Sequence, residues 1–398
     1  MSELTELLEG VEVEWKALWE VTIWDKRFNA VDRDKQPKVE NYQYLLAANL
    51  FNLEHKNGDV FLLSTGKRTG WTTKELAGTY LREGEVVTIP WGKSRPVIDV
   101  LKYYKGLFVT ADNRIATSNN TDILLNKFLF YWLQTQSKVI DGFYRGSGIQ
   151  HPNMAAVLDM SMPIPPISVQ KEIVRILDTF SERTDTLGNE LITELEARKK
   201  HYNYYRDRLL SFEESKVEWK ILGEVTTIGT GSRNTNESIV NGEYPFFVRS
   251  QEPRAINEYE FDETAIITAG DGVGVGKVFH YVIGKYALHQ RAYRIVANDN
   301  SINLKYLFHY MKNNFAKYLE MTSVHASVTS LRKPMFEKYP VPIPSPEEQE
   351  RIVAILDKLD SLTSAISEAL PKEIALRKKQ YEYYRHLLLT FPNDNINE

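Results

Sequence analysis

The sequence predicts an α+β protein in which two domains of similar mixed α/β fold are separated by two long helices, packed as an antiparallel coiled coil with pseudo-twofold symmetry. Three observations predict this fold. A fifty-residue segment occurs twice, at 163–212 and 342–391, with 22 of its 50 positions identical. A shorter segment containing VEWK also occurs twice, at 13–21 and 217–225. Both stretches between the repeats show short apolar runs followed by one helical pattern. The duplication therefore organises the whole chain.

The two unrepeated stretches have the same order of predicted elements. In the first, the β-branched and apolar runs predict strands at 86–89, 97–100, 107–109 and 115–117, followed by a helix at 126–136. In the second, they predict strands at 265–267, 277–279, 286–288 and 293–296, followed by a helix at 304–319. The repeats are offset by 204 residues upstream and by 179 downstream, so the first stretch carries about 25 extra residues.

The repeats also set the expected domain boundaries. We expect a first domain at 1–162, a first helical spacer at 163–212, a second domain at 213–341, a second helical spacer at 342–391 and a tail at 392–398. Disorder is expected only in the first ten residues and in the tail.

Each copy of the fifty-residue segment has the apolar pattern of an amphipathic helix. Side chains expected to pack between the helices recur at spacings of three and four. They are Ile173, Leu177, Phe180, Leu187, Leu191, Leu195 and Tyr202 in the first copy, and Ile352, Leu356, Leu359, Ile366, Leu370, Ile374 and Tyr381 in the second. Stripes of equal length make antiparallel pairing of the two copies self-consistent. The alternative is that two unrelated amphipathic helices lie in two separate cores.

The ends of the expected helices carry capping signals. Ser345 precedes Pro346, a good residue for a first helical position, and Ser168 is the expected cap of the first copy. About 45 helical residues would reach roughly 65 Å, which suits a spacer better than the core of a small domain. Pro371 predicts a kink or a break in the second helix.

Composition narrows the class of protein. The 398 residues have room for two to three domains, and the lack of cysteine excludes disulfides and thiolate metal sites. An acidic N-terminus without an apolar core and the lack of a long apolar run predict neither signal peptide nor membrane span, hence a cytoplasmic protein. A net charge of −4 argues against a sequence-blind nucleic-acid binder, but not against a DNA reader whose cations lie in a few loops.

Catalytic motifs fail when they are read residue by residue. The glycine-rich stretch at 269–278 has Asp271 where a phosphate loop needs its first glycine and Val278 where it needs Ser or Thr, so a tight turn is expected. The Glu-Trp-Lys triplets at 14–16 and 218–220 lack the preceding Pro-Asp of a nuclease. The histidines show no ligand spacing, and no glycine-rich loop for S-adenosylmethionine is present. We expect no catalytic residues, no metal and no cofactor in this chain.

Several predicted loops are rich in groups that can reach phosphates or base edges. Arginine reads guanine, and asparagine or glutamine reads adenine, through paired hydrogen bonds. The candidate DNA-binding residues are Lys67, Arg68, Thr69, Lys93, Ser94, Arg95, Arg145 and Ser147 in the first domain, and Arg233, Asn234, Arg249, Gln251, Arg254, His289, Gln290 and Arg291 in the second. For each cluster alone, an ordinary solvated loop is the alternative.

Two variable domains, each followed by a repeated helix, resemble the specificity subunits (HsdS) of type I restriction–modification systems. The repeats carry PIP and Q..IV.ILD at the head, and RKK.Y.YYR..LL.F at the tail. The tail motifs at 198–206 and 377–385 look most like the IC-type branch of that family. The resemblance covers essentially the whole chain.

The resemblance implies a non-catalytic subunit of a DNA adenine methyltransferase and ATP-dependent restriction complex. Each variable domain would be a target recognition domain for one half of an asymmetric, bipartite double-stranded DNA sequence, and the helices would set the half-site spacing. Its partners would be two copies of a methyltransferase subunit that binds S-adenosylmethionine, and restriction and translocation subunits that use ATP and Mg. The alternative is a coiled-coil scaffold that binds no DNA, which gives no reason for two diverged loop-rich domains.

Overall fold

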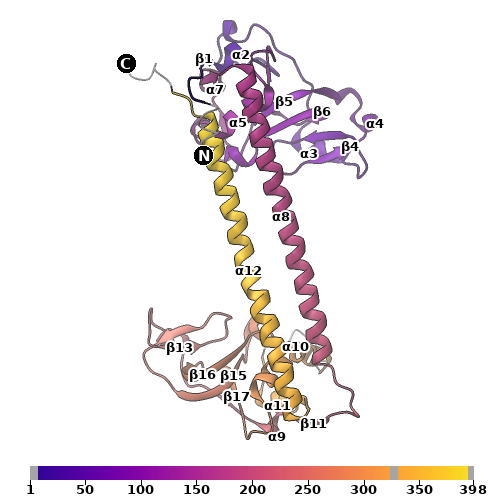
Figure 1. Ribbon diagram of the computed structural model, residues 1–398, viewed down its shortest axis with the longest axis vertical. Helices are drawn as coiled ribbons and strands as arrows, with labels where there is room; N and C mark the ends of the chain where they lie inside the picture. The colour runs from indigo at the N-terminus through magenta and orange to yellow at the C-terminus, as the bar shows by residue number, and fades with distance from the viewer. Residues whose placement is uncertain (1–7, 323–329, 393–398) are drawn as a thin grey trace. The chain divides into compact units, whose positions relative to one another are not determined.

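The computed structural model describes residues 8–322 and 330–392. Residues 1–7 and 393–398, where the sequence predicts disorder, lie outside the described residues. The chain forms two compact units (Figure 1). The first unit contains 1–189 together with 373–398, and the second contains 190–372.

Among its described residues, the first unit has ten strands, six of which form its main sheet. Its strands are β1 (Glu14–Ala17), β2 (Thr22–Trp24), β3 (Val60–Leu63), β4 (Gly70–Thr72), β5 (Arg82–Pro90), β6 (Lys102–Thr110), β7 (Asn113–Ser118), β8 (Tyr144–Arg145), β9 (His151–Pro152) and β10 (Ser161–Ile164). Its helices are α2 (Leu18–Val21), α3 (Ala47–Leu50), α4 (Lys74–Ala77), α5 (Asn126–Thr135), α6 (Ser137–Gly142), α7 (Met154–Leu158) and the start of α8 (Ile167–Leu209). The sheet order is β2-β7-β5-β6-β3-β4, with only β3 and β6 parallel.

Alternation along β5 explains why both faces of this sheet are covered. Val87 and Ile89 pack with α5 in the main core of the first unit. Val86 points to the other face, where Tyr42 packs against the core cluster. Tyr42 belongs to the 35-residue segment between β2 and β3, whereas the corresponding segment between β12 and β13 has 13 residues. Most of the extra length of the first half therefore covers a sheet face.

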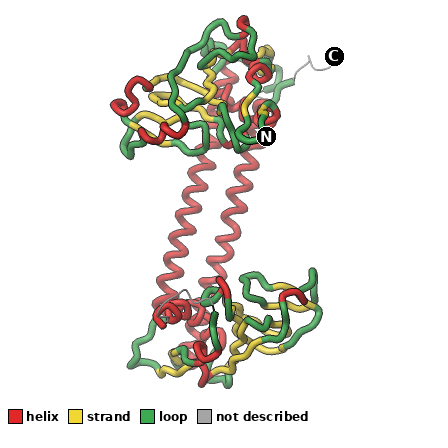
Figure 2. The backbone as a smooth tube through the Cα atoms, turned by 180° about the vertical axis from the view of Figure 1, so that it is seen from behind, coloured by secondary structure: helices red, strands yellow, loops and turns green. Residues whose placement is uncertain are grey.

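The second unit contains an equivalent sheet. Its strands are β11 (Glu218–Ile221), β12 (Thr226–Thr230), β13 (Tyr244–Phe247), β14 (Arg254–Ile256), β15 (Phe261–Ala269), β16 (Phe279–Leu288), β17 (Ala292–Ala297) and β18 (Pro340–Ile343). Its helices are α9 (Leu222–Val225), α10 (Leu304–Thr322), α11 (Lys333–Glu337) and most of α12 (Pro346–Leu389). The order β12-β17-β15-β16-β13-β14 matches that of the first unit strand for strand, again with one parallel pair. In Figure 2 the strands of each unit gather in one region bordered by loops.

The central hairpins of the two sheets share one glycine requirement. Gly106 in β6 has a φ of +136°, and Gly284 in β16 has a φ of +95°. They lie opposite Gly84 and Glu263 respectively, at matching positions of the two hairpins. A side chain would strain either backbone, so both central strands require a glycine at this position.

The repeated VEWK segments have a common structural role. In the first unit they form β1, which pairs with β10 so that Glu14 lies opposite Ile164. In the second unit β11 pairs with β18 so that Glu218 lies opposite Ile343. Because β10 and β18 lead directly into the long helices, the two repeated parts of each half are hydrogen-bonded to each other.

Three predictions about secondary-structure elements are corrected. Ser168 lies inside α8, where Val169 N donates to Pro166 O at 2.9 Å, so Ser168 is not the cap. Residues 97–99 form a 3₁₀ turn instead of a strand because Val100 N and Leu101 N bond back to Val97 O. Ser345 does accept from Glu348 N at 3.3 Å, as a capping residue should. The break predicted as one alternative at Pro371 is also wrong, because helix α12 runs unbroken from Pro346 to Leu389; a kink there stays a prediction. Among the described residues, no helix is both long and apolar enough to cross a membrane.

Candidate nucleic-acid interface

In the second unit, three of the predicted loops meet at one edge of the sheet. Arg233 N donates to Leu288 O at 3.2 Å, and Gln290 N donates to Arg233 O at 3.0 Å. The side chains of Gln290 and Asn234 are also bonded, at 2.5 Å. The loops after β12 and β16 are therefore joined through both backbone and side chains.

Two exposed arginines of these loops share one carboxylate. Arg249 Nη1 lies 2.8 Å from Asp271 Oδ1, and Arg291 Nη1 lies 3.0 Å from Asp271 Oδ2. Burial acts to raise the pKa of Asp271, but the hydrogen bonds from the two arginines outweigh it and hold the pKa below its usual value. Asp271 is therefore charged at neutral pH and fixes both guanidinium groups.

The other predicted residues of the second unit are placed differently. Arg233 is bonded to Glu237 and Glu258, and Arg254 donates to Thr235 O and Ser238 Oγ. The side chain of His289 is buried, while Gln251 is exposed. His289 Nδ1 accepts from Arg291 N at 3.0 Å, so His289 supports the turn and is a poor candidate for a base contact.

In the first unit, the loop after β3 is hydrogen-bonded to a half-buried lysine. Lys102 Nζ donates to Ser64 O at 2.8 Å and to Gly66 O at 2.5 Å. Burial lowers the pKa of Lys102 to about 8. The loop carries Lys67 and Thr69, both exposed, and Arg68, which pairs with Glu54. Lys102 thus orders the backbone that presents the predicted contacts.

Lys93 is a correction to the predicted set. Its side chain is buried, pairs with Asp141 and lies 4.5 Å from the ring centre of Tyr144. A lysine in this position holds the β5–β6 connection to α6 and cannot reach a phosphate. Its backbone bonds to Gln150, which brings the exposed Ser94 and Arg95 next to the β8–β9 hairpin. The hairpin carries the exposed Arg145 and Ser147.

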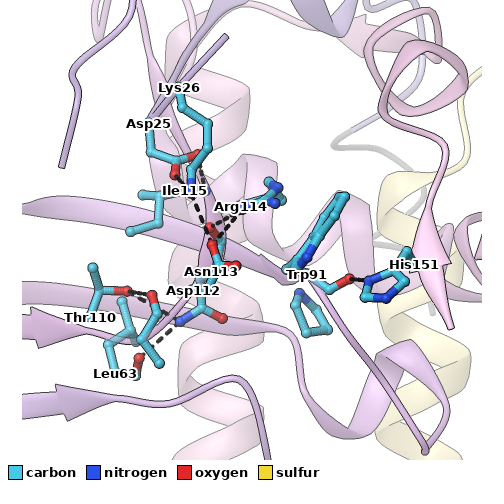
Figure 3. Close-up of polar contacts among 12 residues, drawn as sticks. Asp25, Lys26, Leu63, Trp91, Thr110, Asp112, Asn113, Arg114, Ile115 and His151 are labelled. Carbon is cyan, nitrogen blue, oxygen red and sulfur yellow. Dashed lines mark hydrogen bonds and ion pairs between the residues drawn. The ribbon is translucent and has the colours of Figure 1, made fainter. Parts of the chain in front are cut away.

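A buried polar cluster lies at the same edge of the first sheet and was missed from sequence (Figure 3). Asp112 accepts from Lys26 at 2.9 Å and from Arg114 at 2.8 Å. Arg114 lies 3.9 Å from the ring centre of Trp91, and Asp25 accepts from Ile115 N at 3.0 Å. Burial raises the pKa of Asp25, with the bond from Ile115 opposing the rise. These residues are scattered through the sequence. Asp112 and Arg114 lie between the strands predicted at 107–109 and 115–117, whereas no element was predicted near Asp25 and Lys26.

In each unit, an equivalent glutamine of the long helix is hydrogen-bonded to the loop that precedes α5 or α10. Gln170 Nε2 donates to Ile123 O at 2.7 Å and to Pro165 O at 2.9 Å. Gln349, 179 residues later, donates to Ser301 O at 3.2 Å and to Pro344 O at 2.9 Å. Both side-chain oxygens accept a backbone N–H, from Leu125 and Asn303 respectively. The repeated glutamine therefore holds the loop before α5 in the first unit and the loop before α10 in the second.

An equivalent aspartate follows two turns along each helix, with different partners. In the first unit Asp178 accepts from Tyr131 at 2.5 Å and from Lys127 at 2.8 Å. In the second unit His309 Nε2 lies 2.8 Å from Asp357 Oδ1 and His309 Nδ1 lies 4.0 Å from Asp360. Burial lowers the pKa of His309, against the opposing effect of Asp357. Neutral His309 is thus the hydrogen-bond donor to Asp357.

This histidine predicts that the second unit loses stability in mild acid. The unfolded chain binds a proton near pH 6.5, whereas folded His309 does so only at lower pH, so stability is complete above pH 6.5 and falls below it. We expect hydrogen-exchange protection of α10 amides, corrected for intrinsic rates, to decrease from pH 7.5 to 5.5. His309→Gln keeps a donor to Asp357 and should reduce that decrease.

The pH series has an internal control in α5, whose matching residue is Tyr131. His280 and His289 also have pKa values lowered first by burial, so His309→Gln should leave a residual slope. An identical slope in the wild type and in His309→Gln would contradict the assignment.

Within each unit, the start of one long helix packs beside the end of the other. In the first unit Ile173 and Leu177 share a core with Leu388 and Leu389. In the second unit Ile352 and Leu356 share a core with Leu210. The remaining predicted stripe residues are all half-buried: Phe180, Leu187, Leu191, Leu195, Tyr202, Leu359, Ile366, Leu370, Ile374 and Tyr381. Pairing along the middle of the helices stays a prediction.

Comparison with known proteins places these features in one family. The family model for the type I restriction modification DNA specificity domain matches twice, at 38–197 and 214–376. The EcoR124I/EcoR124II specificity subunit of a type I restriction enzyme from Escherichia coli is 33% identical, over 98% of both chains. A putative type I restriction enzyme specificity subunit from Haemophilus influenzae is 30% identical, again over 98% of both chains.

Solved structures share the fold at low sequence identity. A chain from a study of complex assembly and conformational transition of a type I restriction–modification system matches with a TM-score of 0.63 and 16% identity, covering 96% of this chain and 98% of the other. The HsdS subunit from Thermoanaerobacter tengcongensis matches with a TM-score of 0.53 and 16% identity, covering 95% and 96%. The finer similarity to an IC-type branch stays a prediction.

Proposed function

Because the chain belongs to the family of type I restriction–modification specificity subunits, we propose that its two units are target recognition domains that each read one half of a bipartite DNA sequence. One observation carries the proposal. The two sheets have the same strand order, yet the loops at their equivalent edges carry different polar residues. A common scaffold with different readers suits an asymmetric target.

The division of labour follows the repeats. Residues 1–162 and 213–341 form the two recognition domains, and 163–212 and 342–391 form the helical spacers that set the distance between half-sites, with 392–398 as a tail. The hydrogen bonds of Gln170 and Gln349 to their domains support this role, because a spacer must hold each recognition domain in a fixed orientation.

The loop residues proposed to contact DNA are those whose side chains reach solvent at the two sheet edges. They are Lys67, Arg68, Thr69, Ser94, Arg95, Arg145 and Ser147 in the first domain and Arg233, Asn234, Arg249, Gln251, Arg254, Gln290 and Arg291 in the second. Several of the cations are already paired with carboxylates, which favours reading of base edges over sequence-blind attraction to phosphates.

The chemistry belongs to partner subunits. The two repeated helices offer similar surfaces as sites for two copies of a methyltransferase subunit, which would bring S-adenosylmethionine. Restriction and translocation subunits would bring ATP and Mg. This chain supplies the address on double-stranded DNA, and we place it in the cytoplasm with the genome that the complex would modify.

Domain exchange tests the proposal. Replacing residues 217–341 by the equivalent stretch of a relative should change only one half of the methylated sequence, because each domain carries its own reading loops. The readout is mapping of methylated adenines after expression with the methyltransferase partner.

The reciprocal exchange within the first domain is the control, and it should change the other half alone. A change in both halves from either exchange would contradict modular reading. Methylation without any sequence preference, or a chain that assembles but binds no duplex, would favour a scaffold instead.

A further inference from the structure

We propose that the glycine-rich loop at 269–277 positions Arg249 and Arg291 as a pair that reads guanine in the half-site of the second recognition domain. The inference rests on the proposed function and adds to it a base, the residues that read it and the element that holds them. The same stretch fails as a phosphate loop, so its glycines need another explanation.

The loop holds both arginines by their side chains. The Asp271 carboxylate bonds one nitrogen of each guanidinium, at 2.8 Å to Arg249 and 3.0 Å to Arg291. The Asp271 side chain is 18% exposed, whereas those of Arg249 and Arg291 are 41% and 64% exposed. A guanidinium has five N–H donors, so one bond to Asp271 leaves enough to engage O6 and N7 of a guanine. The carboxylate is therefore the more buried partner, and both guanidinium side chains are accessible to solvent.

The loop also holds both arginines by their backbone. Gly270 N donates to Arg291 O at 2.9 Å, and a Cβ on Gly270 would lie 2.7 Å from that oxygen. A Cβ on Gly274 would lie 2.6 Å from Arg249 O. Neither backbone oxygen can move away as a flexible side chain could. The glycines therefore permit a close approach to the two residues that Asp271 also bonds.

A buried histidine completes the support. His289 N donates to Phe247 O at 2.9 Å, which fixes the end of β13 two residues before Arg249. Arg291 N donates to His289 Nδ1 at 3.0 Å. The backbones of both arginines are thus joined through His289 as well as through the glycine-rich loop. Such pre-organisation lowers the cost of ordering the side chains when a base binds.

In the first domain a carboxylate also joins two cations, but its arginine is buried. Asp112 bonds Lys26 and Arg114, but the Arg114 side chain is only 6% exposed and is covered by Trp91. That bridge stabilises the sheet edge and presents no donors to a base. The paired arginines are therefore a property of the second domain, so the two half-sites should differ in this respect.

The experiment uses the complex of the full chain with its methyltransferase partner and a pool of duplexes with randomised half-sites. We expect the wild type to select a guanine at a fixed position in one half-site. Arg249→Ala and Arg291→Ala should each reduce that preference about 5- to 150-fold, the range of one bidentate arginine contact. The other half-site should be selected as before. Lys338→Ala removes an exposed cation of the same domain and serves as the matched control.

Asp271→Asn separates positioning from folding. It keeps both arginines in the chain but removes the charge that holds their guanidinium groups, so binding to unrelated duplexes should strengthen and depend more steeply on salt. The preference for guanine should weaken several-fold at the same time. Simple damage to the fold would weaken binding to every duplex and would not change the selected bases.

The experiment distinguishes failure of this inference from failure of the proposed function. A bipartite target whose guanine preference survives in both arginine variants, or that has no guanine in the half changed by them, overturns the inference and leaves the proposed function standing. A complex that selects no bipartite sequence at all overturns the proposed function itself. Guanine preference reduced strongly in both arginine variants and several-fold in Asp271→Asn, with the other half-site unchanged, supports the inference.

Discussion

Moving the two half-sites apart by two base pairs is expected to reduce binding by the assembled complex at least about 100-fold. Two base pairs add about 7 Å and turn the second half-site by about 70° around the duplex. Helices α8 and α12 are continuous over 43 and 44 residues, which gives the proposed spacer little means of adjusting. Only one domain could then engage its bases, and specific contacts supply several orders of magnitude in affinity.

The spacing series needs duplexes of equal length and composition. A duplex with an altered spacer sequence but the original spacing should bind as the original does. Gel retardation or fluorescence anisotropy at one fixed salt concentration gives the comparison. Equal binding at every spacing would show that the helices do not act as a ruler.

Replacing Leu177 near the start of α8, or Leu356 near the start of α12, by alanine is expected to destabilise the unit that contains it by about 2–5 kcal/mol. The two leucines occupy equivalent positions, and both side chains are fully buried. Leu177 lies in the core between α5 and α8, and Leu356 lies in the core between α10 and α12. Leu177→Ala should therefore reduce hydrogen-exchange protection in α5, and Leu356→Ala should do so in α10. Each leaves a cavity lined by residues of one unit.

Two exposed leucines on the same helix provide controls. Leu362 is 50% exposed and Leu376 is 60% exposed, so their replacement by alanine should change stability by less than about 0.5 kcal/mol. Equal loss of protection in both units from Leu177→Ala alone would contradict independent cores.

The repeated parts of the fold could be predicted because their patterns are long. Fifty residues of three-and-four spacing determine a helix regardless of context, and the stripe from Ile173 to Tyr202 is buried or half-buried as such a pattern requires. Short apolar runs were less reliable. Of the predicted strand at 277–279 only Phe279 is in a strand, and it begins β16, which ends with the predicted run 286–288. The two predicted strands are therefore one, since the glycine at 284 and the polar residues between them do not interrupt the pairing of β16 with β15.

The candidate site was harder to predict because sequence gives residue type without partner. Lys93 and Arg95 are both cations of one predicted loop. Lys93 is buried and paired with Asp141, which is distant in sequence, whereas Arg95 is exposed. Asp271 had the wrong identity for a phosphate loop and for that reason was set aside. Its role depends on Arg249 and Arg291, which strand pairing alone brings to it.

The first unit is assembled from both ends of the described chain, and this constrains the order of folding during translation. Leu388, Leu389 and Phe391 lie in its core, and Trp15 Nε1 donates to Pro392 O at 3.3 Å. Residues 190–372 are contiguous, so the second unit has all its parts while the ribosome is still adding the last helix. The first unit, although synthesised earlier, keeps an apolar surface open until residue 391 emerges. A released chain truncated after residue 372 contains the whole second unit but lacks the last part of the first, so it should recruit chaperones through its first domain.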